Sequence, residues 1–244
     1  MAKVSVIIPA AGAGERFGGK ENKIFARIKA QPMFIRTLEA FSGRDDVSQI
    51  LLVCSQADLP EVRDRYGGHL GLMGAAVLEG GPTRTQSVRN ALGKVSDDAD
   101  LVCVHDAARP CLAKPWVDAV FTEAAKTGAA ILALPIHGTI KEVSDAGVID
   151  RTLKRDEFNN IWEAQTPQVF ARELLLRAYE AGKDATDDAS LVEAIGHPVS
   201  VVPGDPRNIK VTTPQDLHFA AAVINTLPKP KEKRPFHPFQ EAEW

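Results

Sequence analysis

The feature that most constrains the fold is a recurrence of short, β-branched apolar runs, separated by segments with helical spacing. Continuous apolar runs of this length are typical of strands that are buried on both faces of a parallel sheet. The runs are Val4–Ile8, Gln49–Cys54, Ala75–Leu78, Leu101–Val104, Ala129–Leu134 and Val199–Val202.

Two of the intervening segments place their apolar residues near one face of a helix. These are Phe34, Ile35, Leu38, Ala40 and Phe41 in one segment and Val117, Val120, Phe121 and Ala124 in the other. Strands that alternate with helices predict an α/β fold with a doubly wound, mostly parallel twisted sheet, as in Rossmann-like proteins. Ligands bind outside the carboxyl ends of the strands in such sheets. The loops after Ile8, Leu78, Val104 and Val202 are therefore the first candidates for a site.

One segment does not follow this alternation of strands and helices, and its sequence predicts a β-hairpin. Residues 139–153 alternate around an Asp-Ala-Gly sequence, which is typical of a hairpin turn. A lone hairpin is only marginally stable in water. We therefore expect an arm at about residues 137–160 that packs on a second subunit, with packing on its own domain as the alternative. The arm belongs to a single domain, residues 1–227, and residues 228–244 are expected to form a flexible tail.

Composition excludes several classes of protein. The three cysteines Cys54, Cys103 and Cys111 show no CxxC spacing, which argues against a disulfide framework or a zinc site and favours the cytoplasm. The formal net charge of -3 indicates no general nucleic-acid-binding surface. Lysines in the tail leave nucleic-acid binding as a minor alternative, although glutamates dilute their charge. No apolar stretch approaches the roughly 18 residues that a membrane span needs.

A glycine-rich loop, residues 9–23 (PAAGAGERFGGKENK), follows the first apolar run. Small residues let backbone N–H groups approach phosphates closely, and Arg16 and Lys23 add positive charge. The loop therefore predicts a triphosphate site, with a plain flexible loop as the alternative.

Two better-known phosphate-binding motifs match this loop less well. A dinucleotide-binding motif needs a third glycine where Phe17 stands. A Walker A loop needs serine or threonine where Glu21 stands, and that carboxylate would face an anionic ligand.

The loop resembles the signature of nucleotidyltransferases that activate sugars and polyols, and further motifs follow in the same order. Residues 80–88 resemble GGxxRxxSV, 104–110 VHDAARP, 165–168 QTPQ, 186–190 TDEAS and 208–212 NIKVT. From about residue 4 to 224 the chain is similar to the 2-C-methyl-D-erythritol 4-phosphate cytidylyltransferases. The related ribitol 5-phosphate cytidylyltransferases share most of these motifs.

The resemblance implies a reaction of CTP with 2-C-methyl-D-erythritol 4-phosphate in non-mevalonate isoprenoid biosynthesis. The products would be 4-diphosphocytidyl-2-C-methyl-D-erythritol and pyrophosphate, with Mg²⁺ or another divalent cation as cofactor and a homodimer joined through the arm. An acceptor phosphate is already a nucleophile, so the protein has to align two polyanions and offset their charge. Ribitol 5-phosphate as acceptor, or an inactive nucleotide-binding relative, remain as alternatives.

The same resemblance implies which residues form the site. The catalytic residues would be Arg16, Lys23, Arg155 and Lys210. The nucleotide would be bound by Ala10, Ala11, Gly12, Gly81, Arg84, Ser87 and Asp106. The acceptor would be bound by Asp106, Ala107, Arg109, Thr139, Arg155 and Thr186, with Thr139 and Arg155 supplied by the neighbouring subunit.

Three positions allow a closer interpretation. Asp106 ends an apolar run, where an acidic magnesium ligand would lie, although an Asp there can also cap the next helix. In the family pattern T-x-x-R-x-x-L-W, three residues separate the arginine from the tryptophan. Here six residues, 156–161, separate Arg155 from Trp162, so Arg151 is a substitute candidate for the role of Arg155. Asp188 stands where the family has Glu, which keeps the charge and shortens the side chain.

Overall fold

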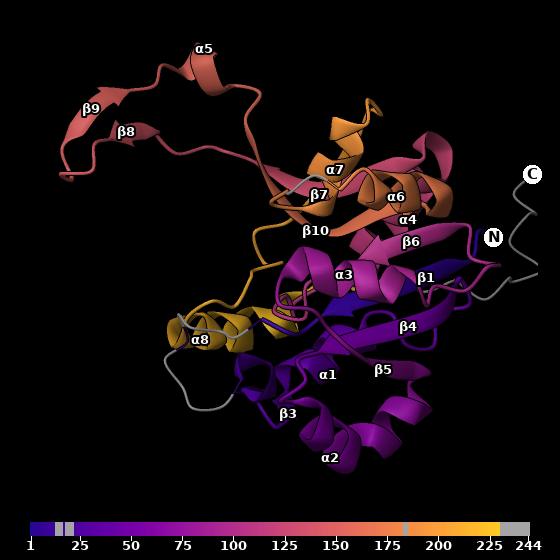
Figure 1. The fold of residues 1–244 in the computed structure, drawn as a ribbon. Helices are drawn as coiled ribbons and strands as arrows, with labels where there is room; N and C mark the ends of the chain where they lie inside the picture. Colours follow the sequence, from indigo (N-terminus) through magenta and orange to yellow (C-terminus); the bar gives the residue numbers. More distant parts are fainter. Residues whose placement is uncertain (13–16, 18–21, 183–184, 230–244) are drawn as a thin grey trace, which may run out of the picture.

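Seven strands form the centre of the structure, a computed structural model that describes residues 1–12, 17, 22–182 and 185–229 (Figure 1). They lie in the order β11-β7-β10-β6-β1-β4-β5. Neighbouring strands are parallel except at β10, which is antiparallel to both β6 and β7. The bounds are β1 Val4–Pro9, β4 Val47–Cys54, β5 Ala75–Glu79, β6 Leu101–Val104, β7 Ala129–Pro135, β10 Trp162–Ala171 and β11 Ser200–Pro203. The predicted mostly parallel α/β sheet is confirmed.

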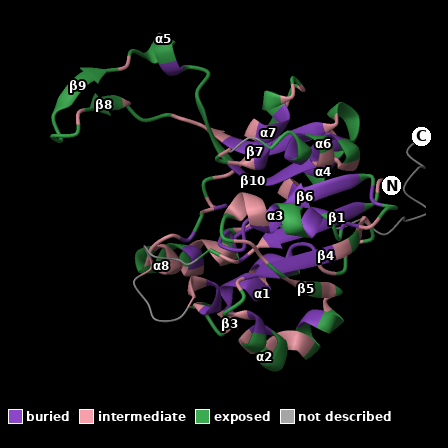
Figure 2. Ribbon diagram, in the orientation of Figure 1, coloured by how far each residue is buried: buried purple, intermediate pink, exposed green. Residues whose placement is uncertain are grey.

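Alternate residues of the central strands enter two different cores. In β4, Ile50, Leu52 and Cys54 belong to one apolar cluster, whereas Leu51 and Val53 belong to the other. Side chains on a strand point to opposite faces in turn, so a strand that is apolar throughout must be covered on both sides. The continuous apolar runs of the sequence therefore produce a sheet between two layers of helices (Figure 2).

Each face of the sheet is covered by its own set of helices. One core contains side chains from α1 (Met33–Glu39), α2 (Leu59–Leu72) and α4 (Lys114–Thr127). The other contains side chains from α3 (Arg84–Leu92), α6 (Arg172–Glu180) and α7 (Asp188–Ala194).

Helix α4 illustrates how the sequence sets an element. Pro115 lies in its first turn, where a missing N–H costs nothing. Val117, Phe121 and Ala124 recur at helical spacing and are buried. The helix stops at Gly128, whose φ of 83° is left-handed and whose N–H bonds the Ala124 carbonyl.

An arm projects from the sheet between β7 and β10 (Figure 1). It carries the antiparallel strands β8 (Lys141–Val143) and β9 (Ile149–Thr152) and the short helix α5 (Arg155–Phe158). The predicted hairpin is thus confirmed. At its base, Pro135 of β7 pairs with Trp162 of β10.

Short elements complete the described chain. They are η2 (Lys23–Phe25), β2 (Arg27–Ile28), β3 (Gln31–Pro32), α8 (Pro214–Val223) and η3 (Ile224–Thr226). Ala220 of α8 packs in a third cluster with Met33 and Val211, which fixes the segment after β11 against the body. Most of the predicted tail, residues 230–244, lies outside the described residues. Within the described part of the chain, every helix is too short or too polar to cross a bilayer.

Candidate active site

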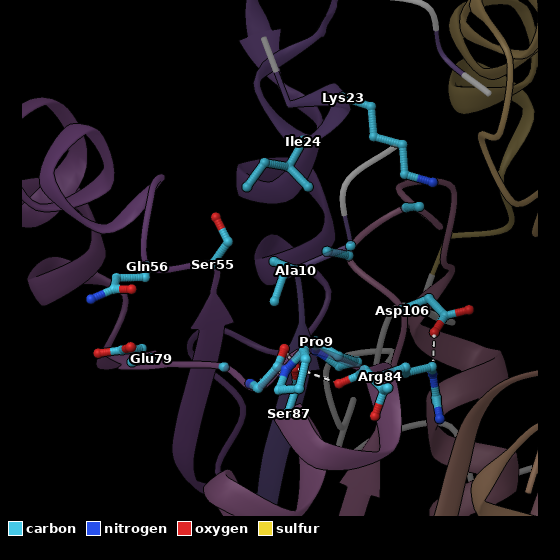
Figure 3. Close-up of a pocket in the computed structure, with 18 of the residues that line it drawn as sticks. Pro9, Ala10, Lys23, Ile24, Ser55, Gln56, Glu79, Arg84, Ser87 and Asp106 are labelled. Carbon is cyan, nitrogen blue, oxygen red and sulfur yellow. Dashed lines mark hydrogen bonds and ion pairs between the residues drawn. The ribbon is translucent and has the colours of Figure 1, made fainter. Parts of the chain in front are cut away.

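A pocket of about 530 Å³ opens at the carboxyl ends of β1, β4, β5 and β6 (Figure 3). Its position follows from topology, because parallel strands bring their carboxyl ends to one edge of the sheet. The lining residues are Pro9, Ala10, Ala11, Gly12, Lys23, Ile24, Ser55, Gln56, Glu79, Gly80, Gly81, Pro82, Thr83, Arg84, Ser87, Asp106, Ala107, Ala108 and Lys210.

The start of α3 and the loop before it build one wall of the pocket. Ser87 Oγ accepts a hydrogen bond from the Gly81 N–H (3.1 Å) and lies 2.9 Å from the Thr83 carbonyl. A Cβ on Gly80 would lie 2.7 Å from Ala11 Cβ and 2.8 Å from Ser87 Oγ. Real side chains do not approach this closely, so glycine at position 80 lets the loops after β1 and β5 meet.

Asp106, directly after His105 at the end of β6, is the centre of the charged end of the pocket. Its Oδ2 lies 2.7 Å from Lys210 Nζ and its Oδ1 lies 3.2 Å from Arg84 Nε. Burial alone would raise the pKa of Asp106, but the nearby Arg84 and Lys210 charges outweigh it and hold that pKa well below its usual range. The carboxylate therefore stays ionised.

A buried polar chain holds Asp106 from behind. The Asp106 N–H donates to Thr166 Oγ1 (3.1 Å), which lies 2.9 Å from His105 Nδ1. His105 Nε2 lies 3.1 Å from the Arg109 carbonyl, which can only accept, so the proton sits on Nε2 and Nδ1 accepts from Thr166. Burial lowers the pKa of His105 to about 4, which keeps the ring neutral.

Two lysines from distant parts of the chain line the same pocket. Lys23 lies at the start of η2, and its Nζ donates to the Val211 carbonyl (3.2 Å). The Val211 N–H in turn donates to the Ala108 carbonyl (2.7 Å), which ties the Lys210 segment to the loop after β6. The topology therefore gathers positive charge at one end of the pocket, where a polyanion would be stabilised.

The structure brings most of the expected site residues together. On the pocket wall lie Ala10, Ala11, Gly12, Lys23, Gly81, Arg84, Ser87, Asp106, Ala107 and Lys210. Arg16 lies outside the described residues. Arg109 lies behind the wall, where its Nη1 donates to the Asn208 carbonyl (2.7 Å), and Thr186 is exposed before α7 and does not line the pocket.

The arm residues do not line the pocket of their own chain. Thr139 and Arg155 are exposed on the arm, which points away from the sheet (Figures 1 and 2). Arg155 Nη1 donates to the His137 carbonyl (3.2 Å). Arg151, the substitute candidate, pairs with Glu142 (2.6 Å) and with a second arm glutamate.

Sequence reasoning missed Ser55, Gln56 and Glu79. Glu79 and Gln56 lie at the end of the pocket away from Asp106 (Figure 3). The strand-end rule could have found Ser55 and Gln56, because the apolar run ending at Cys54 terminates at the same edge.

The described residues hold no cluster of three or more His, Cys, Asp or Glu side chains that could cage a metal ion. Asp106 is nevertheless a carboxylate at the charged end of the pocket. Mg²⁺ is commonly held by one or two carboxylates together with substrate phosphates, so the site fits a cation that enters with a nucleotide.

A glycine-lined pocket at the strand ends of an α/β sheet, with lysine, arginine and one carboxylate at its charged end, fits the class of nucleotidyltransferases. The comparisons with known proteins narrow the class. The chain belongs to the family of 2-C-methyl-D-erythritol 4-phosphate cytidylyltransferases, which it matches over residues 4–226.

Individual relatives agree over nearly the full length. A 2-C-methyl-D-erythritol 4-phosphate cytidylyltransferase from Rhodopirellula baltica is 41% identical over 237 residues, which cover 92% of this chain and 96% of the relative. The crystal structure of the enzyme of that name from Thermus thermophilus matches with a TM-score of 0.75 at 34% identity, covering 91% and 99% of the two chains. That of a 4-diphosphocytidyl-2C-methyl-D-erythritol synthase from Anaerococcus prevotii matches with a TM-score of 0.76 at 28% identity, covering 92% and 99%.

Proposed function

We propose that this enzyme transfers the cytidylyl group of CTP to 2-C-methyl-D-erythritol 4-phosphate and releases pyrophosphate, in isoprenoid biosynthesis. The observation that carries the proposal is the convergence of Lys23, Arg84 and Lys210 on the pocket, where Asp106 pairs with Arg84 and Lys210. Family membership favours methylerythritol phosphate over ribitol 5-phosphate as the acceptor.

The chemistry needs alignment and charge rather than a strong base. A phosphate oxygen of the acceptor bonds to the α-phosphorus of CTP, and the bond from that phosphorus to the bridging oxygen of the β-phosphate breaks. Pyrophosphate leaves with the electron pair. Lys23, Arg84 and Lys210 hold the two polyanions together and offset the negative charge that grows on the phosphoryl oxygens.

Asp106 is the residue that would hold Mg²⁺ in this site. A bound Mg²⁺ supplies further charge neutralisation on the triphosphate. Lys210 Nζ is on a side chain that is 41% exposed, so it is able to turn from Asp106 toward a phosphate. Asp106 thereby holds the lysine near its working position before the nucleotide enters.

The acceptor site is completed by the arm of a second subunit in a homodimer. The arm exposes the apolar side chains of Val143, Val148 and Ile149, which are 52%, 62% and 57% accessible. An isolated two-stranded hairpin with exposed apolar residues gains stability by packing on another surface. In this arrangement Thr139 and Arg155 reach the partner's pocket and bind the acceptor phosphate.

We place the reaction in the cytoplasm. All three cysteines are free and buried, which fits a reducing compartment.

A pyrophosphate-release assay tests the function. The enzyme is given CTP, UTP, ATP or GTP with either methylerythritol phosphate or ribitol 5-phosphate. Turnover is expected with CTP and methylerythritol phosphate, at a kcat/KM at least about tenfold above every other pair, since an unpaired polar group in a tight pocket is costly. A higher kcat/KM with ribitol 5-phosphate would transfer the assignment to that acceptor, and CTP binding without turnover with either acceptor would refute an enzymatic role.

A further inference from the structure

Asp188, the first residue of α7, contacts the site from outside the pocket. Its side chain is fully buried, and its Oδ2 accepts a hydrogen bond from Arg84 Nη2 at 2.7 Å. The Tyr179 hydroxyl of α6 donates to the other carboxylate oxygen. Asp188 therefore links the helical layer of α6 and α7 directly to a side chain of the pocket wall.

The Asp188 backbone is fixed by the sheet. Gln168 Oε1, on β10, accepts hydrogen bonds from the N–H groups of Asp188 (3.1 Å) and Ala189 (3.0 Å). Gln168 Nε2 donates to Asp187 (2.8 Å). Contacts with α3, α6 and β10 thus determine where the Asp188 carboxylate lies. A side chain that only filled space would not need so many directed hydrogen bonds.

The fixed position of the Asp188 carboxylate determines the orientation of the Arg84 guanidinium. A guanidinium is a rigid planar fork, so two contacts in different directions fix its plane. Arg84 Nε contacts Asp106 and Nη2 contacts Asp188, while no hydrogen bond joins Nη1 to the described residues. Without Asp188, the fork would be free to turn and pair with both oxygens of Asp106, in competition with Lys210.

From this geometry we infer that Asp188 is a positioning residue, which holds the Arg84 guanidinium so that its remaining donor faces the phosphates of the bound nucleotide. The inference rests on the proposed function, because it assumes a nucleotide in this pocket. It assigns to the partly buried ion pair of Arg84 and Asp188 a role in nucleotide affinity, in addition to the packing of α7 on the sheet.

The test compares Asp188→Asn with Asp188→Glu and with the wild type, by CTP titration calorimetry and steady-state kinetics. Asp188→Asn is expected to raise the Kd and KM for CTP by about tenfold or more, with the KM for the acceptor changed by less than about threefold. Asp188→Glu keeps the carboxylate and is expected to restore most of the CTP affinity. In an Arg84→Ala background, Asp188→Asn is expected to have no further effect on CTP binding.

Asp46 provides the matched control. It pairs with Arg44 through two hydrogen bonds (2.8 and 2.7 Å) just before β4, at the opposite edge of the sheet from the pocket. Asp46→Asn is expected to lower the unfolding temperature and leave the Kd for CTP unchanged.

An unchanged Kd for CTP in Asp188→Asn would overturn the inference, as would an equal loss in the Arg84→Ala background. If Asp188→Asn does not fold, the double variant Arg84→Ala with Asp188→Asn is used instead, because it leaves neither charge unpaired. It is compared with Arg84→Ala alone, and any further loss of CTP affinity overturns the inference. Failure of the wild type to bind or turn over CTP would instead refute the proposed function.

Discussion

At the scale of single residues, the neutral ring of His105 helps to fix the backbone of Asp106, whose carboxylate lines the pocket. It accepts from Thr166 and donates to the Arg109 carbonyl, and Thr166 in turn accepts from the Asp106 N–H. Each group can satisfy its neighbour only while the imidazole carries a single proton. The position of Asp106 therefore depends on His105 staying uncharged.

This arrangement predicts a specific pH dependence of stability. His105 has a folded pKa of about 4, below its ordinary value of about 6.5, so the unfolded chain binds a proton first as the pH falls. The contribution is fully present above about pH 6.5 and is lost progressively toward about pH 4. Between about pH 7.5 and pH 5, this group should remove about 2 kcal/mol from the free energy of unfolding, as measured by urea denaturation.

A His105→Gln variant isolates the effect, because glutamine also donates and accepts but does not titrate. It is expected to be less stable at neutral pH and to lose about 2 kcal/mol less than the wild type on the same change of pH. Equal losses in the two proteins would show that His105 is not the titrating group.

At the scale of secondary-structure elements, the apolar runs predicted six of the seven strands of the central sheet. Their short, continuous apolar sequences are enough to recognise them, although the two outermost strands, β5 and β11, are only partly buried. Strand β10 was missed because Gln165, Thr166 and Gln168 interrupt its apolar pattern. These side chains are buried only because distant partners satisfy them: Gln165 donates to the Asp205 carbonyl and Gln168 accepts from the start of α7. Such long-range partners are invisible in a local pattern.

The site was predicted unevenly for the same reason. Gly81, Asp106 and Lys210 were expected from the family resemblance, and all three line the pocket at the strand ends that the topology brings together. The hydrogen bonds of Arg84 to Asp188 and of Asp106 to Thr166 depend on packing between elements that are far apart in the sequence, so residue spacing does not predict them.

The close contact between the loops after β1 and β5 predicts the effect of a substitution at Gly80. A methyl group there would collide with Ala11 and Ser87, and would lie 3.2 Å from the Cys54 carbonyl. Gly80→Ala should therefore lower the free energy of unfolding by about 1–3 kcal/mol, in proportion to the forced separation of the loops. The KM for CTP should rise at the same time, which thermal unfolding and steady-state kinetics would measure together.

Gly67, inside α2, is the control for this substitution. A Cβ at Gly67 meets nothing within 4 Å, so Gly67→Ala should raise stability by about 0.5–1 kcal/mol through helix propensity and leave kinetics unchanged. A Gly80→Ala protein as stable as the wild type would contradict the tight contact.

At the scale of the whole molecule, the chain separates its nucleotide pocket from its arm. Lys23 lines the pocket, whereas Arg155 is exposed on the arm and does not reach that pocket in the same chain. The division makes sense if each functional site combines the body of one subunit with the arm of another.

A heterodimer of two defective subunits tests this combination. Lys23→Ala alone is expected to lower turnover by at least about a hundredfold, with little loss of stability, and Arg155→Ala to raise the KM for the acceptor. Subunits carrying one change each are co-expressed with different tags, and the heterodimer is purified through both. One of its two sites then has an intact body and an intact arm, so it should show about half of the wild-type activity.

The control pairs a wild-type subunit with one that carries both changes. If arms serve the neighbouring subunit, each site of this heterodimer contains one defect, and its activity at acceptor concentrations well below the KM falls far below half of the wild-type value. An active control together with an inactive first heterodimer would show that each arm acts on its own chain, and the sizes measured by gel filtration would reveal whether dimers form at all.

The pairing of Pro135 with Trp162 pins both ends of the arm to one edge of the sheet. Insertions between Arg155 and Trp162 are accordingly absorbed beyond that edge, here in part as α5. A change in the length of this segment can therefore alter how far the arm extends, while β7 and β10 keep their register. If the arm binds the acceptor of the neighbouring subunit, as proposed, acceptor preference can change without a change in the nucleotide pocket.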